Sequence, residues 1–168
     1  MILEERDRFM KLFDIMVVNA NAWLATVPEE KRDWVPIQNP NVQLGPRAPK
    51  LTIKAFHVHM TVTDYHWFRA VRDAEDGDTI EIPLDKELTE DLFSSDFADR
   101  CQSMHEENKK IVAAYGEADL RKNFTYANVK RTGMELLWNN YAHRAHHLGH
   151  MDIYIRQADL VAPNYFPF

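Results

Sequence analysis

The chain has 168 residues, of which 45% are hydrophobic and 27% charged, with one cysteine and a formal net charge of −6. This length predicts one domain over residues 1–168, since a single core can grow to this size before chains usually divide. One cysteine excludes an internal disulfide framework, and the acidic start MILEERDRFM lacks the basic and then apolar pattern of a signal peptide. We therefore expect a cytoplasmic protein.

Two classes of partner are excluded on similar grounds. The longest uncharged apolar stretch, Ile15 to Pro28, contains Asn19 and Asn21 and falls short of the roughly 20 apolar residues that cross a bilayer. An acidic chain without a cluster of Lys and Arg is not expected to bind nucleic acid, because basic side chains supply most of that affinity. We expect a small-molecule substrate, no nucleic acid and no membrane.

The first predicted element is an amphipathic helix over residues 3–27, because apolar side chains recur there at three- and four-residue steps. These side chains are Phe9, Leu12, Phe13, Met16, Val17, Ala20, Trp23, Leu24 and Val27. Pro28 ends the helix, and the five prolines from Pro28 to Pro49 predict a long ordered loop. We expect Trp34 to anchor this loop to the bundle.

The next two predicted helices enclose a less regular segment. One covers residues 51–73 and stops at the Asp-Gly-Asp turn of residues 76–78. Residues 79–84 alternate as a short extended piece, too little to predict a sheet, and residues 89–93 favour a helical turn. The other helix runs from an N-cap at Ser94 or Ser95 to Tyr115, with Gly116 at its end.

The last predicted helix follows a polar connection. Thr132 and Glu135 form the capping-box pattern T-G-M-E, which opens a helix that runs to Ala158. Four long helices in a domain of this size predict an all-α four-helix bundle.

Histidine is the unusual feature of the composition, since seven of the eight fall in two short segments and only His105 stands apart. The second predicted helix holds His57, His59 and His66, and the fourth holds His143, His146, His147 and His150. Two clusters so far apart in the sequence suggest two elements that meet at one site.

The spacing on the fourth helix places three of these histidines on one face. His143 and His147 lie about 40° apart around the helix, and His150 lies about 20° from His143 on the other side. His146 lies about 60° from His143, at the margin of the stripe, where it either supports a ligand or faces solvent. On the second helix, His59 and His66 share a face and His57 points nearly opposite.

Such a pair at positions i and i+4 can hold one divalent ion through two imidazole nitrogens at about 2.0 to 2.1 Å. One more His from a neighbouring helix completes three neutral ligands and leaves positions open for water or substrate, as in catalytic zinc sites. The alternative is ordinary surface or core histidine, but buried imidazoles without a partner cost free energy. Three imidazoles suit zinc, nickel, iron or copper, and manganese is a further candidate.

Familiar catalytic motifs are absent or incomplete. The spacing of His143 and His147 matches a zinc-protease helix, but Arg144 stands where the general-base Glu must be. The sequence contains neither a glycine-rich phosphate loop nor a G-x-S-x-G nucleophile elbow. We do not expect a peptidase of that type or a nucleotide-binding fold.

The segment TGMELLWNNYAHRAHHLGHMDIYIRQADLVAPNYF resembles the last helix of the DinB-like (DinB/YfiT) metal-binding four-helix bundles. The residues in the family's places are His143, His146, His147, Gly149, Tyr154, Arg156 and Pro163. The segment LTIKAFHVHMTVTDYHWF is similar to the family's second helix, which selects His59 over His57 and sets Asp64 and Trp67 in companion positions. The resemblance covers nearly the whole chain and is weakest over residues 76–130.

Carried over residue by residue, the resemblance implies a metal triad of His59, His143 and His147. The chain departs from the family at Arg144 for Glu, at Leu148 for Arg and at His150 for Gln. His150 is open to several roles: a fourth ligand, a general base, a group that positions substrate, or a polar residue hydrogen-bonded to water.

Three other residues near the implied triad receive predictions of their own. His66 is expected to line the pocket rather than to touch the ion. Asp64 lies about 140° from His59 around the helix, so we expect it to be a cap or an inter-helix salt-bridge partner. Tyr154, with His150, is a candidate for orienting the electrophile and is predicted with it as a catalytic residue.

The family includes enzymes that use a low-molecular-weight thiol, so the resemblance implies a metal-dependent thiol S-transferase or isomerase with that thiol as cosubstrate. Coordination to a divalent ion deprotonates a thiol and creates the nucleophile. The first alternative is a metal-dependent hydrolase, in which the ion lowers the pKa of a bound water to about 7. The second is a non-catalytic stress protein that binds a metal or a small ligand. A homodimer is also implied.

Overall fold

The computed structural model describes residues 1–35, 50–94 and 97–162. Its long helices are α1 (Ile2–Thr26), α3 (Ile53–Asp73), α5 (Phe97–Ala113) and α7 (Gly133–Gln157). The shorter elements are α2 (Glu29–Arg32), α4 (Lys86–Leu92), α6 (Glu117–Arg121), β1 (Asn123–Tyr126) and β2 (Val129–Thr132). The predicted four-helix bundle is confirmed, and each of its four helices begins and ends within a few residues of the expected bounds.

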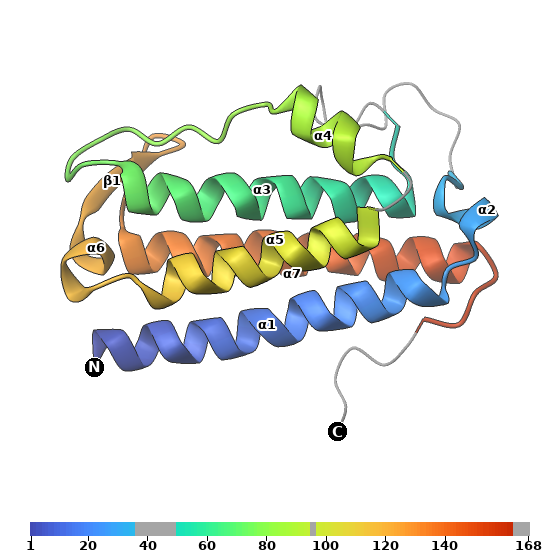
Figure 1. Cartoon of the computed structure of the whole chain (residues 1–168), viewed down its shortest axis with the longest axis horizontal. Coiled ribbons are helices and arrows are strands. Elements are labelled where there is room, and N and C mark those ends of the chain that lie inside the picture. Colours follow the sequence, from blue (N-terminus) through green and yellow to red (C-terminus); the bar gives the residue numbers. More distant parts are fainter. Residues whose placement is uncertain (36–49, 95–96, 163–168) are drawn as a thin grey trace.

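The four long helices lie side by side along the molecule (Figure 1). Helices α1 and α7 run in one direction and α3 and α5 in the other, so α3 and α5 are parallel although they follow each other in the chain (Figure 1). After α3, residues 74–94 travel back along the bundle and carry α4 over α3 (Figure 1). Helix α3 packs on α5 and α7, and α1 packs on the same two helices.

Side-chain caps set the N-termini of the two helices that carry the histidine clusters. The Thr52 hydroxyl accepts a hydrogen bond from the Ala55 amide at 2.9 Å and begins α3. At the start of α7, Thr132 accepts from the Glu135 amide at 3.2 Å while the Glu135 carboxylate accepts from the Thr132 amide at 2.6 Å. This reciprocal pair confirms the predicted capping box.

Aromatic side chains fill much of the core between α1, α3 and α7. Phe9 and Phe13 of α1 stack at 5.3 Å, and Phe68 of α3 meets the Phe13 ring edge-on at 5.3 Å. The apolar face predicted for α1 is buried except at Leu12, which is 38% exposed. The helix predicted from this pattern is present, with Leu12 as the one member of the pattern that faces solvent.

The connections hold most of the structure that the sequence patterns miss. Strands β1 and β2 form an antiparallel hairpin in what was expected to be a polar connection. Its two-residue loop, Ala127 and Asn128, has positive φ at both positions (50° and 62°), as tight hairpins require. Thr79 makes a parallel bridge to Thr125, so the extended piece predicted over residues 79–84 adds only one bridge to this hairpin.

Other connecting segments also differ from the expectation. Helix α4 begins three residues before the predicted turn, because Asp85 caps it by accepting from the Leu88 amide at 2.9 Å. Helices α2 and α6 were not predicted. The expected loop of residues 28–49 therefore holds a helical turn at its start, and its residues 36–49 lie outside the described part of the chain, as do Ser95 and Pro163.

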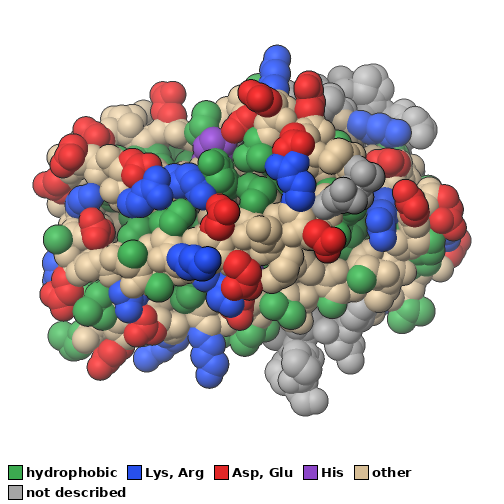
Figure 2. Space-filling model, in the orientation of Figure 1, with side chains coloured by type: hydrophobic (Ala, Val, Ile, Leu, Met, Phe, Trp, Pro, Cys, Tyr) green, Lys and Arg blue, Asp and Glu red, His purple; other side chains and the backbone are tan. Residues whose placement is uncertain are grey.

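The expected anchor of that loop is present. The Trp34 ring meets Tyr154 of α7 edge-on at 6.5 Å. On the molecular surface, acidic and basic side chains are intermixed over the face drawn in Figure 2. Among the described residues, no helix combines the length and the apolar character needed to cross a membrane.

Candidate metal centre

Three histidines from two helices meet between α3 and α7. His59 of α3 points its Nε2 at the Nε2 of His143 of α7, 3.2 Å away. The ring of His147 lies 4.8 Å from that of His59 and 4.5 Å from that of His143, measured between centroids. Each of the three offers one nitrogen within 4.8 Å of the others. The structure thus brings the predicted triad together, and its role as a ligand set stays a prediction.

The surroundings of these imidazoles fit a divalent cation. His59 and His147 are buried and His143 is half-buried, so the site lies at the edge of the core. Burial, followed by the neighbouring His143, lowers the pKa of His147 to about 3. His147 is therefore neutral at pH 7, the form that a metal ligand requires. Its Nδ1 is buried and has no hydrogen bond among the described residues.

Phe56 of α3 forms a wall beside the triad. Its ring stacks on His150 at 5.3 Å with an interplanar angle of 26°, lies 5.8 Å from His147 and meets Tyr154 edge-on at 5.1 Å. Burial lowers the pKa of His150 and raises the pKa of the Tyr154 phenol. At neutral pH, His150 is thus a neutral imidazole and Tyr154 a protonated phenol. Both predicted catalytic residues lie along this wall, and their roles stay predictions.

The residue that replaces the family's Glu is part of a buried ion pair. Arg144 of α7 is 1% exposed, and its Nη1 donates to Oδ2 of Asp64 on α3, which is 3% exposed. The Asn140 amide donates to the other carboxylate oxygen of Asp64 at 3.1 Å. Of the two roles expected for Asp64, the inter-helix salt bridge is the one that the structure contains. The pair joins the two helices that carry the triad.

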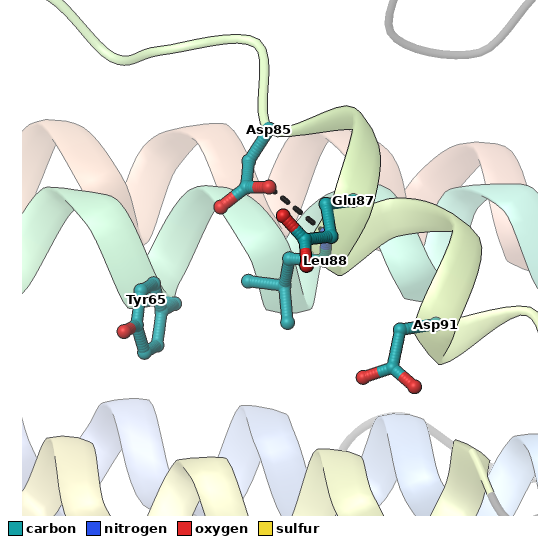
Figure 3. Close-up of a pocket in the computed structure, with 5 residues that line it drawn as sticks. All are labelled: Tyr65, Asp85, Glu87, Leu88 and Asp91. Atoms are coloured by element: carbon teal, nitrogen blue, oxygen red, sulfur yellow. Dashed lines mark hydrogen bonds between the residues drawn. The ribbon is translucent and has the colours of Figure 1, made fainter.

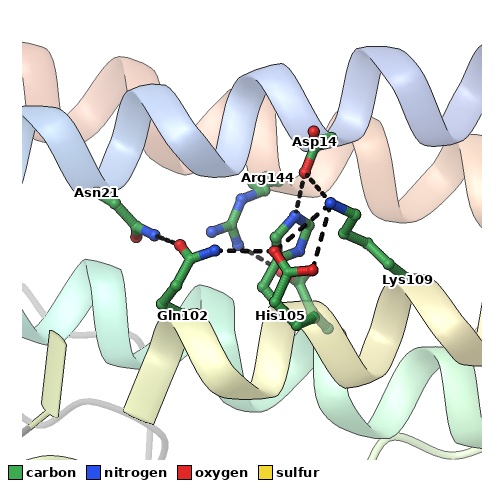
Figure 4. Close-up of polar contacts among 8 residues, drawn as sticks. Asp14, Asn21, Gln102, His105, Lys109 and Arg144 are labelled. Atoms are coloured by element: carbon green, nitrogen blue, oxygen red, sulfur yellow. Dashed lines mark hydrogen bonds and ion pairs between the residues drawn. The ribbon is translucent and has the colours of Figure 1, made fainter. Parts of the chain in front are cut away.

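Two histidines for which no role was predicted are also buried. Nε2 of His105 on α5 lies 2.8 Å from Oδ1 of Asp14 on α1, and Lys109 approaches the same oxygen at 3.3 Å (Figure 4). This contact links α5 to α1, and no local pattern marks it because the residues are far apart in the sequence. His57 lies against Phe97 at 6.1 Å, and neither of its ring nitrogens has a partner within the described ranges.

His66 of α3, which was expected to line the pocket, contacts an acidic residue at the start of α4. Its Nε2 lies 3.0 Å from Oδ2 of Asp85, the residue that caps α4. A cavity of about 520 Å³ opens between α3 and α4 beside this contact. Figure 3 shows its lining residues, Tyr65, Asp85, Glu87, Leu88 and Asp91. His66 therefore connects α3 to the start of α4.

The segment before α4 covers the same side of the triad. A small cavity there is lined by His59, Val62 and Thr63 of α3 and, across from them, by Pro83, Leu84, Asp85 and Thr89. The contact between His66 and Asp85 thus holds in place the segment that covers His59.

Comparisons with known proteins agree with this architecture. A model of the DinB superfamily matches residues 12–151. Two Bacillus subtilis structures share the fold over 94% of this chain: the DinB-like protein YjoA (14% identity, 97% of that chain, TM-score 0.71) and YfiT (12%, 90%, 0.64). A DinB-like protein from Bacillus cereus also covers 94% of this chain and 95% of its own, with 14% identity and a TM-score of 0.65.

The YfiT structure is described as a probable metal-dependent hydrolase with an unusual four-helix bundle topology. No curated protein matches the sequence. The family model spans most of the chain, and the structural likeness extends over nearly all of it. The chain belongs to the DinB superfamily.

Proposed function

We propose that this protein is a metal-dependent enzyme in which His59, His143 and His147 hold one divalent cation. The observation that carries the proposal is the convergence of three imidazoles from two helices, with one ligand nitrogen of each within 4.8 Å of the others. Three neutral protein ligands leave coordination positions for water or substrate, as catalytic metal sites do. The half-buried ring of His143 places the three histidines within reach of the surface.

A cation bound there supplies an activated nucleophile at neutral pH, either water with its pKa lowered to about 7 or a deprotonated thiol. The side chains along the Phe56 wall act on the substrate. The neutral His150 imidazole accepts a proton or a hydrogen bond, and the Tyr154 phenol donates one. The ring contact between Phe56 and His150, at 5.3 Å, fixes the orientation of that imidazole.

Of the two nucleophiles, water is the first candidate, so the proposed reaction is hydrolysis. The description of YfiT as a probable metal-dependent hydrolase, on the same fold, favours it. The second candidate is transfer to a low-molecular-weight thiol, which the resemblance to the DinB-like family supports through the matching positions of the triad and Tyr154. A small-molecule substrate is part of both proposals.

The test combines metal content with turnover. We expect protein purified without an affinity tag to hold about one zinc, nickel, iron or manganese ion per chain and to hydrolyse simple esters or amides in a way that chelation abolishes. Transfer to an added thiol, with no hydrolysis in its absence, would instead establish the second candidate. Metal binding without turnover of any substrate in the panel would leave the non-catalytic binding protein as the function.

Variants distinguish the triad from other histidines. His59→Ala and His147→Ala are expected to lose both the ion and the activity. His105→Gln is the matched control, because its ring contacts Asp14 of α1 and it is not among the three histidines of the triad. Retention of full metal content by both triad variants would contradict the ligand assignment.

A further inference from the structure

Helix α7 carries two interleaved His pairs at positions i and i+4. His143 and His147 belong to the triad, and His146 and His150 form a second pair one helical turn further along. The rings of the second pair are about as close as those of the first, 4.4 Å and 4.5 Å between centroids. Both pairs have the spacing that lets two imidazoles on a helix bind one ion.

His147 belongs to both groups. Its ring lies 5.1 Å from that of His146 and 5.6 Å from that of His150, and one nitrogen of each of the three lies within 4.8 Å of the others. The three residues therefore make a second candidate ligand set, which shares one member with the triad.

His150, one member of this set, has a fixed ring and a ring nitrogen without a hydrogen-bond partner among the described residues. The His150 ring is stacked on Phe56, and its Nδ1 is buried without a hydrogen bond to any described residue. The Nδ1 of His147 is also buried without a hydrogen bond to any described residue. Buried imidazole nitrogens without partners cost free energy, and a bound cation satisfies such an atom.

Solvent exposure decreases from His146 through His150 to His147. His146 is exposed, His150 is half-buried, and His147 is buried beside His59. Imidazole rings thus form a continuous path from solvent to the triad, and each ring along it is within 5.6 Å of the next.

We propose that His146, His147 and His150 form an outer divalent-cation site, which takes up the cation from solvent and passes it to the triad through the shared His147. This inference rests on the proposed function, because the triad is the destination of the cation. Only one of the two sites is occupied at a time, because both need His147 and neither set contains a carboxylate to offset the repulsion between two dications. The triad, which is more buried and joins two helices, is the site of equilibrium occupancy.

The first test measures binding of Co²⁺ and Zn²⁺ to untagged protein freed of metal. Wild-type protein is expected to bind about one ion per chain. The variant His59→Gln/His143→Gln, which keeps the outer set, should still bind about one ion per chain, with at least about tenfold weaker affinity because the outer set is more exposed and lies on one helix. Adding His146→Gln and His150→Gln to that variant should abolish binding.

The second test follows the rate of uptake. A cation held at the outer site is presented to the triad at a high effective concentration, so His146→Gln/His150→Gln should load about tenfold more slowly or worse. Its final metal content and its equilibrium affinity at the triad should match those of wild-type protein. His105→Gln, which belongs to neither set, is the control and should load at the wild-type rate.

These measurements separate the outer site from the proposed function. If the His59→Gln/His143→Gln variant binds no more Co²⁺ than the quadruple variant, or if uptake is unchanged in His146→Gln/His150→Gln, the outer site is wrong while the triad stands. If the His59→Gln/His143→Gln variant keeps wild-type affinity, the triad itself is wrong. Two ions per wild-type chain would overturn the exclusive occupancy.

Discussion

At the scale of single residues, the buried pair of Arg144 and Asp64 joins α3 to α7, and we expect its loss to be costly. Both side chains are almost fully buried, and Asn140 occupies the second carboxylate oxygen of Asp64. Burial raises the pKa of Asp64 to about 6, while Arg144 and Asn140 act in the opposite direction. Without the guanidinium, the buried carboxylate has lost its counter-ion.

Arg144→Met should therefore destabilise the protein by about 3 to 5 kcal/mol, because it leaves an uncompensated buried charge. Urea unfolding at pH 7, followed by circular dichroism, measures this change. The double variant Asp64→Leu/Arg144→Met should recover most of the loss, since apolar pairs of similar volume replace buried ion pairs at little cost. If Arg144→Met is as stable as wild-type protein, the ion pair does not hold α3 to α7.

His57 should make the protein sensitive to mild acid. Burial, and then the positive charge of Arg144, lowers the pKa of His57 from 6.5 to about 3. Between these two values the unfolded chain takes up a proton and the folded chain does not, so stability falls as the pH decreases through this range. Each pH unit costs about 1.4 kcal/mol. Asp64, whose pKa is raised, acts with the opposite sign between its ordinary value and about 6.

His57→Leu removes this proton uptake and two unpartnered buried nitrogens. From pH 7 to pH 5, the variant should lose about 2 kcal/mol less stability than wild-type protein. Urea unfolding at both pH values, with chelator present so that no metal contributes, gives the comparison. Equal losses in the two proteins would show that His57 is not held neutral in the folded state.

At the scale of elements, α7 depends on the close approach of its first turn to α6. A methyl group on Gly133 would overlap the backbone oxygen of Asp119 and crowd Leu120. We expect Gly133→Ala to destabilise the protein by about 1 to 3 kcal/mol, as overpacking does. Thermal unfolding measures the effect.

Gly149 is the matched control on the same helix, because an added Cβ there meets no atom within 4 Å among the described residues. Gly149→Ala should be neutral or should stabilise the protein by about 0.5 to 1 kcal/mol, since alanine favours a helix over glycine. If Gly133→Ala and Gly149→Ala change the stability by the same amount, helix propensity determines the effect at both positions and the contact with α6 does not.

At the scale of the whole molecule, the cation proposed at His59 of α3 and at His143 and His147 of α7 would connect two helices, and this ligand set is assembled only in the folded chain. A ligand of this kind stabilises the fold by about 2.7 kcal/mol at a free concentration of one hundred times its Kd. We expect Zn²⁺ to raise the melting temperature of wild-type protein and to leave that of His59→Ala/His147→Ala unchanged. Calorimetry with and without chelator makes the measurement, and an equal rise in both would place the stabilising ion elsewhere.

The homodimer implied by the family resemblance is a second prediction at this scale. Exposed apolar side chains on α1, namely Leu12, Ile15 and Val18, are the surface that we expect it to cover. Sedimentation of wild-type protein should then give twice the 19.7 kDa mass of the chain. Val18→Glu should yield a monomer with an unchanged circular dichroism spectrum, and a monomeric wild-type protein would exclude the dimer.

Local pattern in the sequence was sufficient for the long helices, the capping box of α7 and the faces of the histidines. The 3.6-residue period determines which side chains share a stripe, so His143 and His147 could be paired from spacing alone. The capping box of Thr132 and Glu135 is likewise a local signal. Pairing His59 with them needed the family resemblance, because periodicity does not say which neighbouring helix meets a given face.

Contacts between distant residues were decided by the tertiary fold. The choice of a salt bridge for Asp64, the contact of His105 with Asp14 and the neighbour of His66 each depend on which helices lie side by side. The hairpin was missed because Ala127 and Asn128 lack the glycine that usually marks such a turn. Spacing orders side chains along one helix, whereas packing of whole helices determines which of them meet.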